Sequence, residues 1–321
     1  MKRLLFLVPS YASFRKPIKK TFEALGWRVL TFDYRKGDSP IRVLRFTPLV
    51  GGREKATEMI NKRIIEINEK FNPDIILVIK GESLGKNLFV KLRKNQKNKI
   101  VNWFPEHMNH WPLAKKIVSY YDYFLCFEPL IARNLKDKGF NNVYYFPFAS
   151  EISNIKPAKK IYDVSFVGTY TPERESILAK FKQFDINIWG DPRWLKSGIK
   201  NNARGGRVTQ DKMKDIISKS KININIHSFF PSEGANLRNF EVTGSTGFLL
   251  TDYVKAQEDL FKIGKDIVCY NSPKDIVVKT AYFLDHEKER EAIARQGFIR
   301  AIKDHNYKKR IKQMLSIIYR K

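Results

Sequence analysis

Residues 222–252 have the sequence ININIHSFFPSEGANLRNFEVTGSTGFLLTD. The apolar runs at its two ends predict buried strands, the first of which ends near His227. Between them, Gly234 marks a turn, and the residues that follow predict a helix that begins there and ends near Thr243. A strand, a helix and a second strand in this order are typical of a parallel α/β sheet, in which ligands bind beyond the carboxyl ends of the strands. The stretch therefore predicts a fold class and the position of a binding site.

The same alternation of apolar runs and amphipathic stretches extends through the whole chain. The strand candidates of the first half are almost continuously apolar, as strands buried on both faces are; they are LLFLVP, WRVLTFD, DIILVI, KIVNWF, YFLCF and VYYFPF. Those of the second half are YDVSFVG, INIWG, ININIH, FLLTD and DIVCY. We therefore expect an α/β protein with two doubly wound, Rossmann-like domains that face each other across a ligand-binding cleft.

The boundary between the two domains is predicted by a polar segment. Residues 151–160, EISNIKPAKK, are basic and contain Pro157, which is typical of a linker. They divide the chain into an N-terminal domain, residues 1–150, and a C-terminal domain, residues 161–305. The remaining residues, 306–321, predict a basic helix with one apolar stripe. This helix either packs on the protein, for instance by returning to the first domain, or lies on an anionic membrane surface.

Composition excludes some classes of protein. The 321 residues are 43% hydrophobic and carry a formal net charge of +27. This apolar content excludes a disordered chain, and the charge favours an anionic partner such as a nucleoside diphosphate or acidic lipid. The basic residues are scattered and no RNA-recognition signature is present, so no specific nucleic acid is expected. The first apolar run is short for a signal peptide and no segment approaches roughly 20 apolar residues, so we expect a cytoplasmic protein.

The motifs of the common cofactor and metal sites are missing from the sequence. Cys126 and Cys269 are far apart, which excludes a close-spaced zinc or redox pair and favours two buried thiols. The absence of a GxGxxG fingerprint argues against a nicotinamide or flavin cofactor. Residues 80–87, KGESLGKN, lack the Walker A spacing and are interpreted as a plain loop. No DxD motif is present, so we expect neither a cofactor nor a metal ion.

Residues 233–241 combine groups that suit a nucleotide. Gly234 lets the backbone approach a ligand closely, and the free N–H groups of a helix that starts there attract an anion such as a diphosphate. Glu241 stands eight residues after Glu233 and can accept both hydrogen bonds of a ribose diol. The segment therefore predicts a nucleotide-binding element. The alternative is that both glutamates are ordinary carboxylates on a helix surface.

These residues resemble the E-x7-E signature of retaining glycosyltransferases with the GT-B fold, in which seven residues separate two glutamates. Three segments are similar to the CgeB-like glycosyltransferase family of spore proteins, namely NLRNFEVTGSTGFLLTD, DIVCYNSPKDI and EREAIARQGFIRAIKDHNYKKR. YDVSFVGTYTPERE and INIWGDPRW resemble the first two strands of that family's donor-binding domain. The resemblance covers residues 160–310 and is weak across the first half.

The resemblance implies roles for residues of the second half. Glu241 would bind the ribose hydroxyls of a nucleotide sugar, and Glu233 would face the donor sugar as a catalytic residue. The resemblance also implies donor contacts for Gly234, Ala235, Asn236 and Arg238. Further donor-binding candidates are Gly168, Arg174, Trp189 and His227. Typical members place an Arg just after the first donor-domain strand, where this chain has Thr169 and Tyr170. The cation that stabilises the departing diphosphate is therefore left open among Arg174, Arg193, Lys196, Arg204 and Arg207.

In the first half, the best candidate for an acceptor site is VNWFPEHMNHWP, residues 101–112, which begins in a predicted strand. Aromatic rings stack on sugar faces and polar groups bind hydroxyls, so Trp103 and His110 are acceptor-binding candidates. His107 or Glu106 is the candidate base for the acceptor hydroxyl. The loop after the first strand adds three acceptor-binding candidates, Ser10, Tyr11 and Arg15. The alternative is a packed, hydrogen-bonded loop.

Together, the residues and the resemblance predict a glycosyltransferase. It would move a sugar from a nucleoside diphosphate sugar to a hydroxyl of a glycan, lipid-linked or other acceptor, without a metal ion. Retention at the anomeric carbon follows from the resemblance alone. Two other hypotheses are a non-catalytic nucleotide-sugar or glycan-binding protein of the same fold and a nucleic-acid-binding protein attracted by the positive charge.

Overall fold

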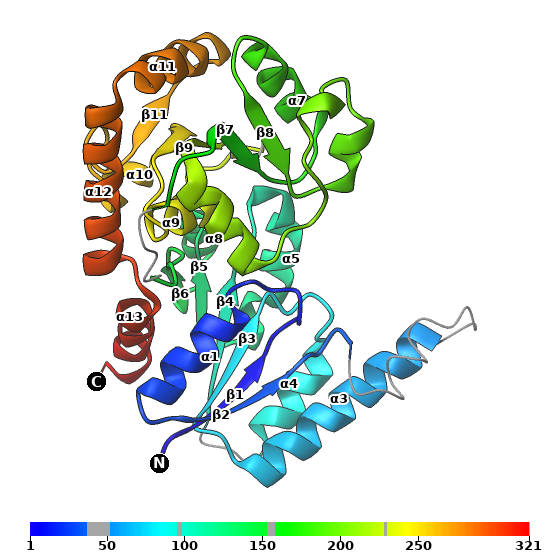
Figure 1. Cartoon of the computed structure of the whole chain (residues 1–321). Helices are drawn as coiled ribbons and strands as arrows, with labels where there is room; N and C mark the ends of the chain where they lie inside the picture. Colours follow the sequence, from blue (N-terminus) through cyan, green and yellow to red (C-terminus); the bar gives the residue numbers. More distant parts are fainter. Residues whose placement is uncertain (37–51, 95–97, 153–157, 228–229, 321) are drawn as a thin grey trace. The chain divides into compact units, whose positions relative to one another are not determined.

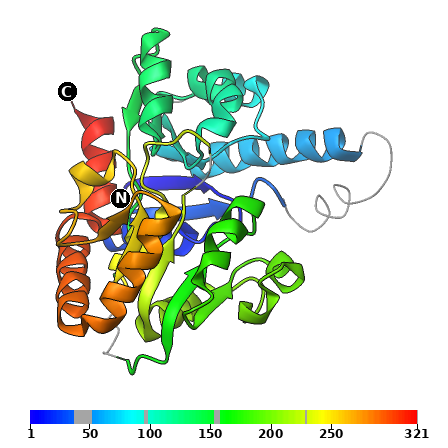
Figure 2. The same ribbon diagram turned by 90° about the horizontal axis from the view of Figure 1, so that it is seen from above.

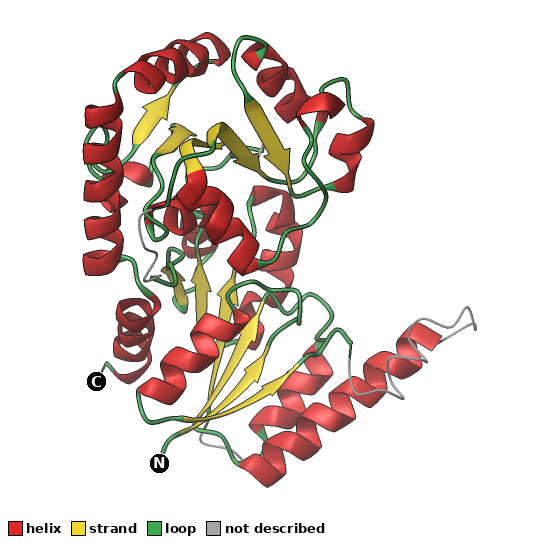
Figure 3. Ribbon diagram, in the orientation of Figure 1, coloured by secondary structure: helices red, strands yellow, loops and turns green. Residues whose placement is uncertain are grey.

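The chain forms two compact units, each built around one sheet (Figures 1 and 3). The N-terminal unit comprises Met1–Pro147 and Ile311–Lys321, and the C-terminal unit comprises Phe148–Arg310. The structure is a computed structural model, and it describes residues 1–36, 52–94, 98–152, 158–227 and 230–320. Most of the predicted linker, residues 153–157, lies outside the described residues.

The sheet of the N-terminal unit has six parallel strands in the order β2-β1-β3-β4-β5-β6. The strands are β1 (Arg3–Leu7), β2 (Arg28–Phe32), β3 (Ile75–Ile79), β4 (Lys99–Phe104), β5 (Tyr123–Cys126) and β6 (Val143–Tyr145). Each coincides with one of the six apolar runs of the first half, although β1 begins one residue earlier, at Arg3, and β3, IILVI, is buried at every position. A parallel sheet covered on both faces requires such continuous runs, so the predicted fold class is confirmed here.

Helices pack against this sheet and supply the rest of the core. They are α1 (Arg15–Ala24), α3 (Gly52–Phe71), α4 (Lys86–Arg93), α5 (Trp111–Ile117) and α6 (Pro129–Asp137), with short 3₁₀ turns η1 (Met108–His110) and η2 (Val118–Tyr120). Their apolar faces contribute Ile60, Leu88, Ile117 and Leu135 to a core that also contains Leu5 from β1. One end of α3, which has 20 residues, extends away from the sheet in both views (Figures 1 and 2).

The last helix, α13 (Tyr307–Tyr319), has its apolar stripe buried in the protein. Ile311, Met314 and Ile318 are at most 3% exposed. The Tyr123 hydroxyl donates to the carbonyl of Ile318 over 3.0 Å, so the end of the helix is held in the N-terminal unit. The stripe is therefore not available to a membrane surface. No helix in the described part of the chain is long and apolar enough to span a bilayer.

The sheet of the C-terminal unit has five parallel strands in the order β11-β10-β9-β7-β8. They are β7 (Tyr162–Val167), β8 (Ile186–Trp189), β9 (Ser220–Asn225), β10 (Leu249–Asp252) and β11 (Val268–Tyr270). Four lie within predicted strands, whereas β9 begins and ends two residues before the predicted ININIH. The chain leaves β7 toward β8 on one side and leaves β9 toward β10 on the other. The connections that follow β7 and β9 therefore diverge, which makes this pair of strands the topological switch point of the sheet.

Six helices and three short 3₁₀ turns complete the C-terminal unit. They are α7 (Pro172–Leu178), η3 (Ala179–Phe181), η4 (Pro192–Lys196), η5 (Lys200–Asn202), α8 (Gln210–Lys219), α9 (Leu237–Thr243), α10 (Gln257–Leu260), α11 (Pro273–Asp285) and α12 (Glu287–Asp304). The side chains of Thr171, Thr209 and Ser272 each accept a hydrogen bond from a backbone N–H of the first turn, and these caps set the starts of α7, α8 and α11.

A buried imidazole in the C-terminal unit predicts how stability depends on pH. His305 is 5% exposed, lies between the rings of Phe240 and Phe261, and its Nε2 is 2.7 Å from the carbonyl oxygen of Leu260. Burial lowers the pKa of His305 to about 4, although the bond to Leu260 opposes the shift. Because the folded pKa lies below the usual 6.5, the neutral ring favours the folded state above pH 6.5, and this advantage is lost as the pH falls toward 4.

We predict that protonation of His305 lowers the free energy of unfolding by about 3 kcal/mol between pH 6.5 and 4. Urea unfolding of the wild type and His305→Gln across this range checks the prediction, since glutamine can donate to Leu260 but does not titrate. The exposed His286, changed to Gln, is the matched control. Equal pH slopes for wild type and His305→Gln would show that His305 is not the group responsible.

Candidate functional site

The candidate donor site lies where strands β7 and β9 end in the C-terminal unit. Gly168 and Thr169 follow β7, and Ile226 and His227 follow β9. The helices that come next, α7 and α9, carry Arg174 and the Glu233–Glu241 segment toward these strand ends through the contacts below. Ligands of doubly wound sheets bind at such a switch point, because the diverging connections leave the strand ends accessible.

Arg174 connects the ends of both strands. Its Nη1 donates to the carbonyl and hydroxyl oxygens of Thr169 over 3.1 and 2.7 Å, and its Nη2 donates to the carbonyl of Ile226 over 2.7 Å. Its Nε is buried and has no hydrogen-bond partner within the described residues. Burial lowers the pKa of Arg174, Asp252 acts in the opposite direction, and Arg238 lowers it further. A desolvated cation with an unused donor is suited to bind an anion.

Arg238 and Glu241 form an ion pair on helix α9. Arg238 Nη1 lies 2.6 Å from Glu241 Oε2, and Arg238 also contacts the sulfur of Met213. Its Nη2 donates to the carbonyl of Val167, at the end of β7, over 3.0 Å. From the residues that the structure describes, the other carboxylate oxygen accepts only a long bond, 3.5 Å, from Gln210. Burial raises the pKa of Glu241 and Arg238 counteracts it, so this oxygen can improve its hydrogen bonding with a ligand hydroxyl.

His227 fastens the loop between β9 and α9 to strand β10. Its Nδ1 is 2.6 Å from Asp252 Oδ1, and its Nε2 accepts the backbone N–H of Asn236 over 3.2 Å. The side-chain amide of Asn239 is 3.1 Å from the same Nε2. These partners assign the proton to Nδ1. Both ring nitrogens are therefore used within the protein, and the expected donor contact of His227 is replaced by a positioning role.

A network of buried amides surrounds His227. The side chains of Asn225 and Asn236 exchange two hydrogen bonds of 3.2 and 3.1 Å, and Asn225 also donates to Thr251 over 3.0 Å. Gln257 donates to the side-chain oxygen of Asn239 over 3.0 Å. Buried polar groups in native proteins are generally paired in this way, and a fully paired network fixes one arrangement of the backbone.

The backbone of the Glu233–Asn236 segment differs from the prediction at one point. Helix α9 begins at Leu237 instead of Gly234, because the side chain of Asn236 caps it by accepting the N–H of Arg238 over 3.0 Å. The N–H of Asn236, expected to face a diphosphate, donates to His227. Gly234 and Ala235 are buried, and the carbonyl of Glu233 accepts the N–H of Ala256 over 2.9 Å. The segment is thus a fixed loop followed by a short helix.

Two other donor-binding candidates are packed inside the unit. Trp189 is 5% exposed and meets the ring of Tyr162 edge-on, with the centroids 5.2 Å apart. Gly168 donates its N–H to the carbonyl of Trp189 and accepts the indole N–H of Trp194, both over 3.0 Å. The direct donor contacts expected of Trp189 and Gly168 are therefore replaced by packing, since strand β8 ends inside the core.

Among the cations left open by the sequence, two are engaged near β8. Arg193 pairs with Asp191 over 2.7 Å, and Arg204 Nε donates to the side chain of Asn187 over 2.6 Å. Arg174 instead contacts residues that follow both β7 and β9. The geometry thus favours Arg174 over Arg193 and Arg204 as the group that faces a ligand at the switch point.

In the N-terminal unit, the carboxylate of Glu106 contacts the side chains of Lys80 and His110. Its Oε1 is 2.6 Å from Lys80 Nζ, and its Oε2 is 3.2 Å from His110 Nδ1. Lys80 follows β3, and both Glu106 and His110 follow β4, so the three side chains gather at the carboxyl edge of this sheet. Two of the predicted acceptor-site residues, Glu106 and His110, are therefore in contact.

His107 and Trp103 lie elsewhere than expected. His107 packs edge-on against Phe127, and its Nδ1 is 3.9 Å from Glu128 Oε2, beyond hydrogen-bond length. Trp103 is 2% exposed and meets the ring of Phe146 at a centroid distance of 5.0 Å. The prediction that Trp103 stacks on an acceptor sugar is wrong, because as part of β4 it is buried in the core.

The loop after β1 is tied to the loop after β2. The N–H of Ser10 donates to Asp33 over 2.8 Å, and Arg35 donates to the hydroxyl of the exposed Tyr11 over 2.7 Å. Arg15 is the first residue of α1. Ser10 and Tyr11 are thus held at the carboxyl edge of the sheet, and their predicted acceptor contacts stay predictions.

Three polar residues of these edges were not predicted from the sequence. Lys80 and Glu82 belong to the segment interpreted as a plain loop, and Asp252 is the last residue of β10. Glu82 Oε1 lies 3.1 Å from Arg35 Nε. Their common signal is a charged side chain at or just after the end of a buried apolar run, where parallel strands present their carboxyl ends.

We predict that His227→Ala lowers the free energy of unfolding by about 2 kcal/mol, because it leaves the carboxylate of Asp252 and the N–H of Asn236 without their buried partner. Urea unfolding at pH 7 provides the measurement. His110→Ala removes a more exposed imidazole and serves as the control, with an expected loss of less than about 0.5 kcal/mol. A loss for His227→Ala as small as that of the control would contradict its positioning role.

Part of the sequence is similar to known glycosyltransferase-like proteins. Residues 174–316, which include Arg174 and the Glu233–Glu241 segment, match a family model described as glycosyl transferase-like. The spore protein CgeB of Bacillus subtilis is 20% identical over 253 residues, which cover 72% of this chain and 78% of that protein. The family match thus lies in the unit that holds the candidate donor site.

Solved structures with a similar fold cover both units. The lipopolysaccharide outer core galactosyltransferase WaaB superposes with a TM-score of 0.66 at 14% identity, over 100% of this chain and 99% of that chain. Sucrose-phosphate synthase from Thermosynechococcus elongatus gives a TM-score of 0.72 at 13% identity, over 100% and 98% of the two chains. Anabaena Alr3699/HepE, solved with UDP and glucose, gives 0.62 at 12% identity, over 98% and 100%. This chain therefore has the GT-B fold of these structures, and its residues 174–316 are similar to glycosyl transferase-like proteins.

Proposed function

We propose that this chain transfers a sugar from a nucleoside diphosphate sugar to an acceptor hydroxyl. The observation that carries the proposal is a desolvated guanidinium, Arg174, and a partly buried carboxylate, Glu241, on the helices that follow the two switch-point strands. A nucleoside diphosphate presents the matching groups, since its phosphates are anionic and its ribose offers two hydroxyl donors.

The roles of the donor-site residues follow from these contacts. Arg174 would bind the diphosphate through its buried Nε, which has no partner within the described residues. Glu241 would accept ribose hydroxyls through the oxygen that, among the described residues, accepts only a 3.5 Å bond from Gln210. Glu233 would face the donor sugar from the loop that His227 and Asn236 hold in place. UDP is the first nucleotide to test, because a protein of similar fold is solved with it.

Retention and independence of a metal ion are further parts of this proposal. Departure of a nucleoside diphosphate concentrates negative charge on the leaving oxygen, and a fixed cation in a partly dry site stabilises that charge. Arg174 is already desolvated and held by bonds to Thr169 and Ile226, so little reorganisation is needed when the charge develops. Retention is supported by the seven-residue spacing between Glu233 and Glu241, as in the retaining enzymes that the segment resembles.

The acceptor would bind at the carboxyl edge of the N-terminal sheet. Glu106 is the candidate base there, since the neighbouring Lys80 and His110 hold its two oxygens in a fixed orientation. His107 is less suited to this role because its ring packs against Phe127. A glycan or a lipid-linked hydroxyl is the acceptor class expected.

We predict that UDP at about 100 times its dissociation constant raises the melting temperature of the wild type by several degrees. Glu241→Ala should lose most of this shift, because it removes a charged hydrogen-bond acceptor worth about 1.5–3 kcal/mol. A thermal-shift titration with UDP, and with guanosine, adenosine and thymidine diphosphates, makes the measurement.

Glu258→Ala is the matched control, since Glu258 is an exposed carboxylate of the same unit that pairs with Lys255. It should retain the full shift. Nucleotide release from the corresponding nucleotide sugar, measured with and without added acceptor, then separates an enzyme from a binding protein. Absence of a shift with every nucleotide, or equal shifts for wild type and Glu241→Ala, would refute the donor site.

A further inference from the structure

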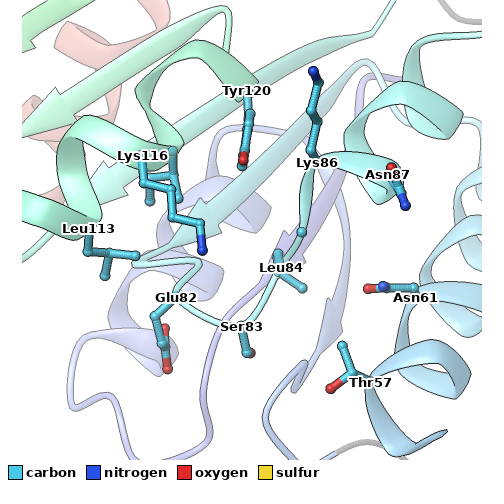
Figure 4. Close-up of a pocket in the computed structure, with 12 residues that line it drawn as sticks. Thr57, Asn61, Glu82, Ser83, Leu84, Lys86, Asn87, Leu113, Lys116 and Tyr120 are labelled. Atoms are coloured by element: carbon cyan, nitrogen blue, oxygen red, sulfur yellow. The ribbon is translucent and has the colours of Figure 1, made fainter. Parts of the chain in front are cut away.

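The N-terminal unit contains a cavity of about 420 Å³ to which the proposed function assigns no role (Figure 4). It is bordered by α3, by the loop that follows β3, and by α5. Figure 4 shows the side chains of Lys116 and Asn61 pointing toward its middle, with Ser83 and Glu82 below them. All of these elements belong to the N-terminal unit, so the cavity is a feature of that unit alone.

The loop after β3 is held in an unusual backbone conformation. Lys80 and Gly81 have φ values of 67° and 83°, a region that a residue with a side chain rarely adopts. A Cβ at Gly81 would collide with the hydroxyl of Tyr121, and the N–H of Gly81 donates to the hydroxyl of Tyr34 over 3.0 Å. Such strain persists only when the surroundings enforce it, and it is frequent at ligand sites. The wall of the cavity that this loop forms is therefore preorganised.

Polar atoms of the cavity lack partners in the protein. The Oγ of Ser83 and the Oδ1 of Asn61 are buried, yet neither has a hydrogen-bond partner among the described residues. Lys116 and Lys86 also line the cavity, and within the described ranges neither ammonium is paired with a carboxylate. Buried polar atoms are usually satisfied, so these atoms indicate a missing ligand.

The charge inside the cavity favours an anion. The carboxylate of Glu82 also lines it, but Arg35 Nε lies 3.1 Å from Oε1 and the Tyr34 hydroxyl lies 2.8 Å from Oε2. With Glu82 paired in this way, Lys116, whose side chain points into the cavity, leaves it with a net positive charge. The apolar part of its wall consists of Leu84, Leu113, Ile117 and Tyr120, and Thr57, Gly85 and Asn87 complete the lining.

We propose that this cavity binds the acceptor through a phosphate group carried on a small hydroxylated body, such as a polyol or a sugar. Lys116 would bind the phosphate, Ser83 and Asn61 the hydroxyls, and the apolar wall the C–H face of the body. The same loop begins at Lys80, which pairs with Glu106, so the cavity and the candidate base share one structural element. That this ligand is the acceptor rests on the proposed function, whereas its binding in the cavity does not depend on that function.

The test is binding of glycerol 3-phosphate to the full-length protein by isothermal titration calorimetry, with glycerol and inorganic phosphate as comparison ligands. We expect saturable binding of glycerol 3-phosphate, weaker binding of phosphate and none of glycerol. Lys116→Ala should lower the affinity for glycerol 3-phosphate about tenfold, which is the effect of losing one charge-assisted contact. Lys115→Ala, which removes an exposed charge one residue away and outside the cavity, should change it less than about twofold.

Binding of UDP to the same variants separates this inference from the proposed function. Lys116→Ala should bind UDP like the wild type, and Glu241→Ala should bind glycerol 3-phosphate like the wild type. If glycerol 3-phosphate shows no saturable binding, or if Lys116→Ala and Lys115→Ala lose equal affinity for it, the cavity is not the proposed ligand site. This conclusion holds even if UDP binds. Equal affinity for inorganic phosphate and glycerol 3-phosphate would show that the cavity does not recognise a hydroxylated body next to the phosphate.

Discussion

Two arginines bridge the ends of β7 and β9, and the candidate donor site of the C-terminal unit depends on these bridges. Arg174 starts from the helix after β7 and bonds the carbonyl that follows β9, whereas Arg238 starts from the helix after β9 and bonds the end of β7. The carbonyls at a switch point have no further strand partner, so the guanidinium groups satisfy them. The same bonds hold two cations at the position where doubly wound sheets bind their ligands.

The surrounding side chains determine how each of these two cations is paired and fix the loop beside them. Glu241 neutralises Arg238 through a 2.6 Å ion pair, whereas Arg174 keeps a buried Nε with no partner among the described residues. His227 and the amides around it fix the loop that carries Glu233, and burial raises the pKa of Glu241. A partly buried carboxylate and a desolvated guanidinium both cost folding free energy, which is typical of residues retained for binding.

The sequence predicted the fold better than the site, for a physical reason. Strands buried on both faces need continuous apolar runs, so β3 and β9 are visible in the sequence itself. Whether a polar or aromatic side chain faces ligand or protein depends on residues far away in the chain. Trp103 is buried by Phe146, and His227 is bound by Asp252, contacts that no local pattern encodes. Asn236, by contrast, is a preferred helix cap, and it indicates the later start of α9.

In the proposed function, Arg174 recognises the diphosphate at the switch point. The ratio of the dissociation constants for uridine and UDP measures this recognition. Calorimetry on the wild type should show a preference for UDP of about 100-fold, as two charge-assisted contacts would provide. In Arg174→Gln the preference should fall to about tenfold or less while the affinity for uridine stays the same. An unchanged ratio, or an equal loss of affinity for both ligands, would contradict the account.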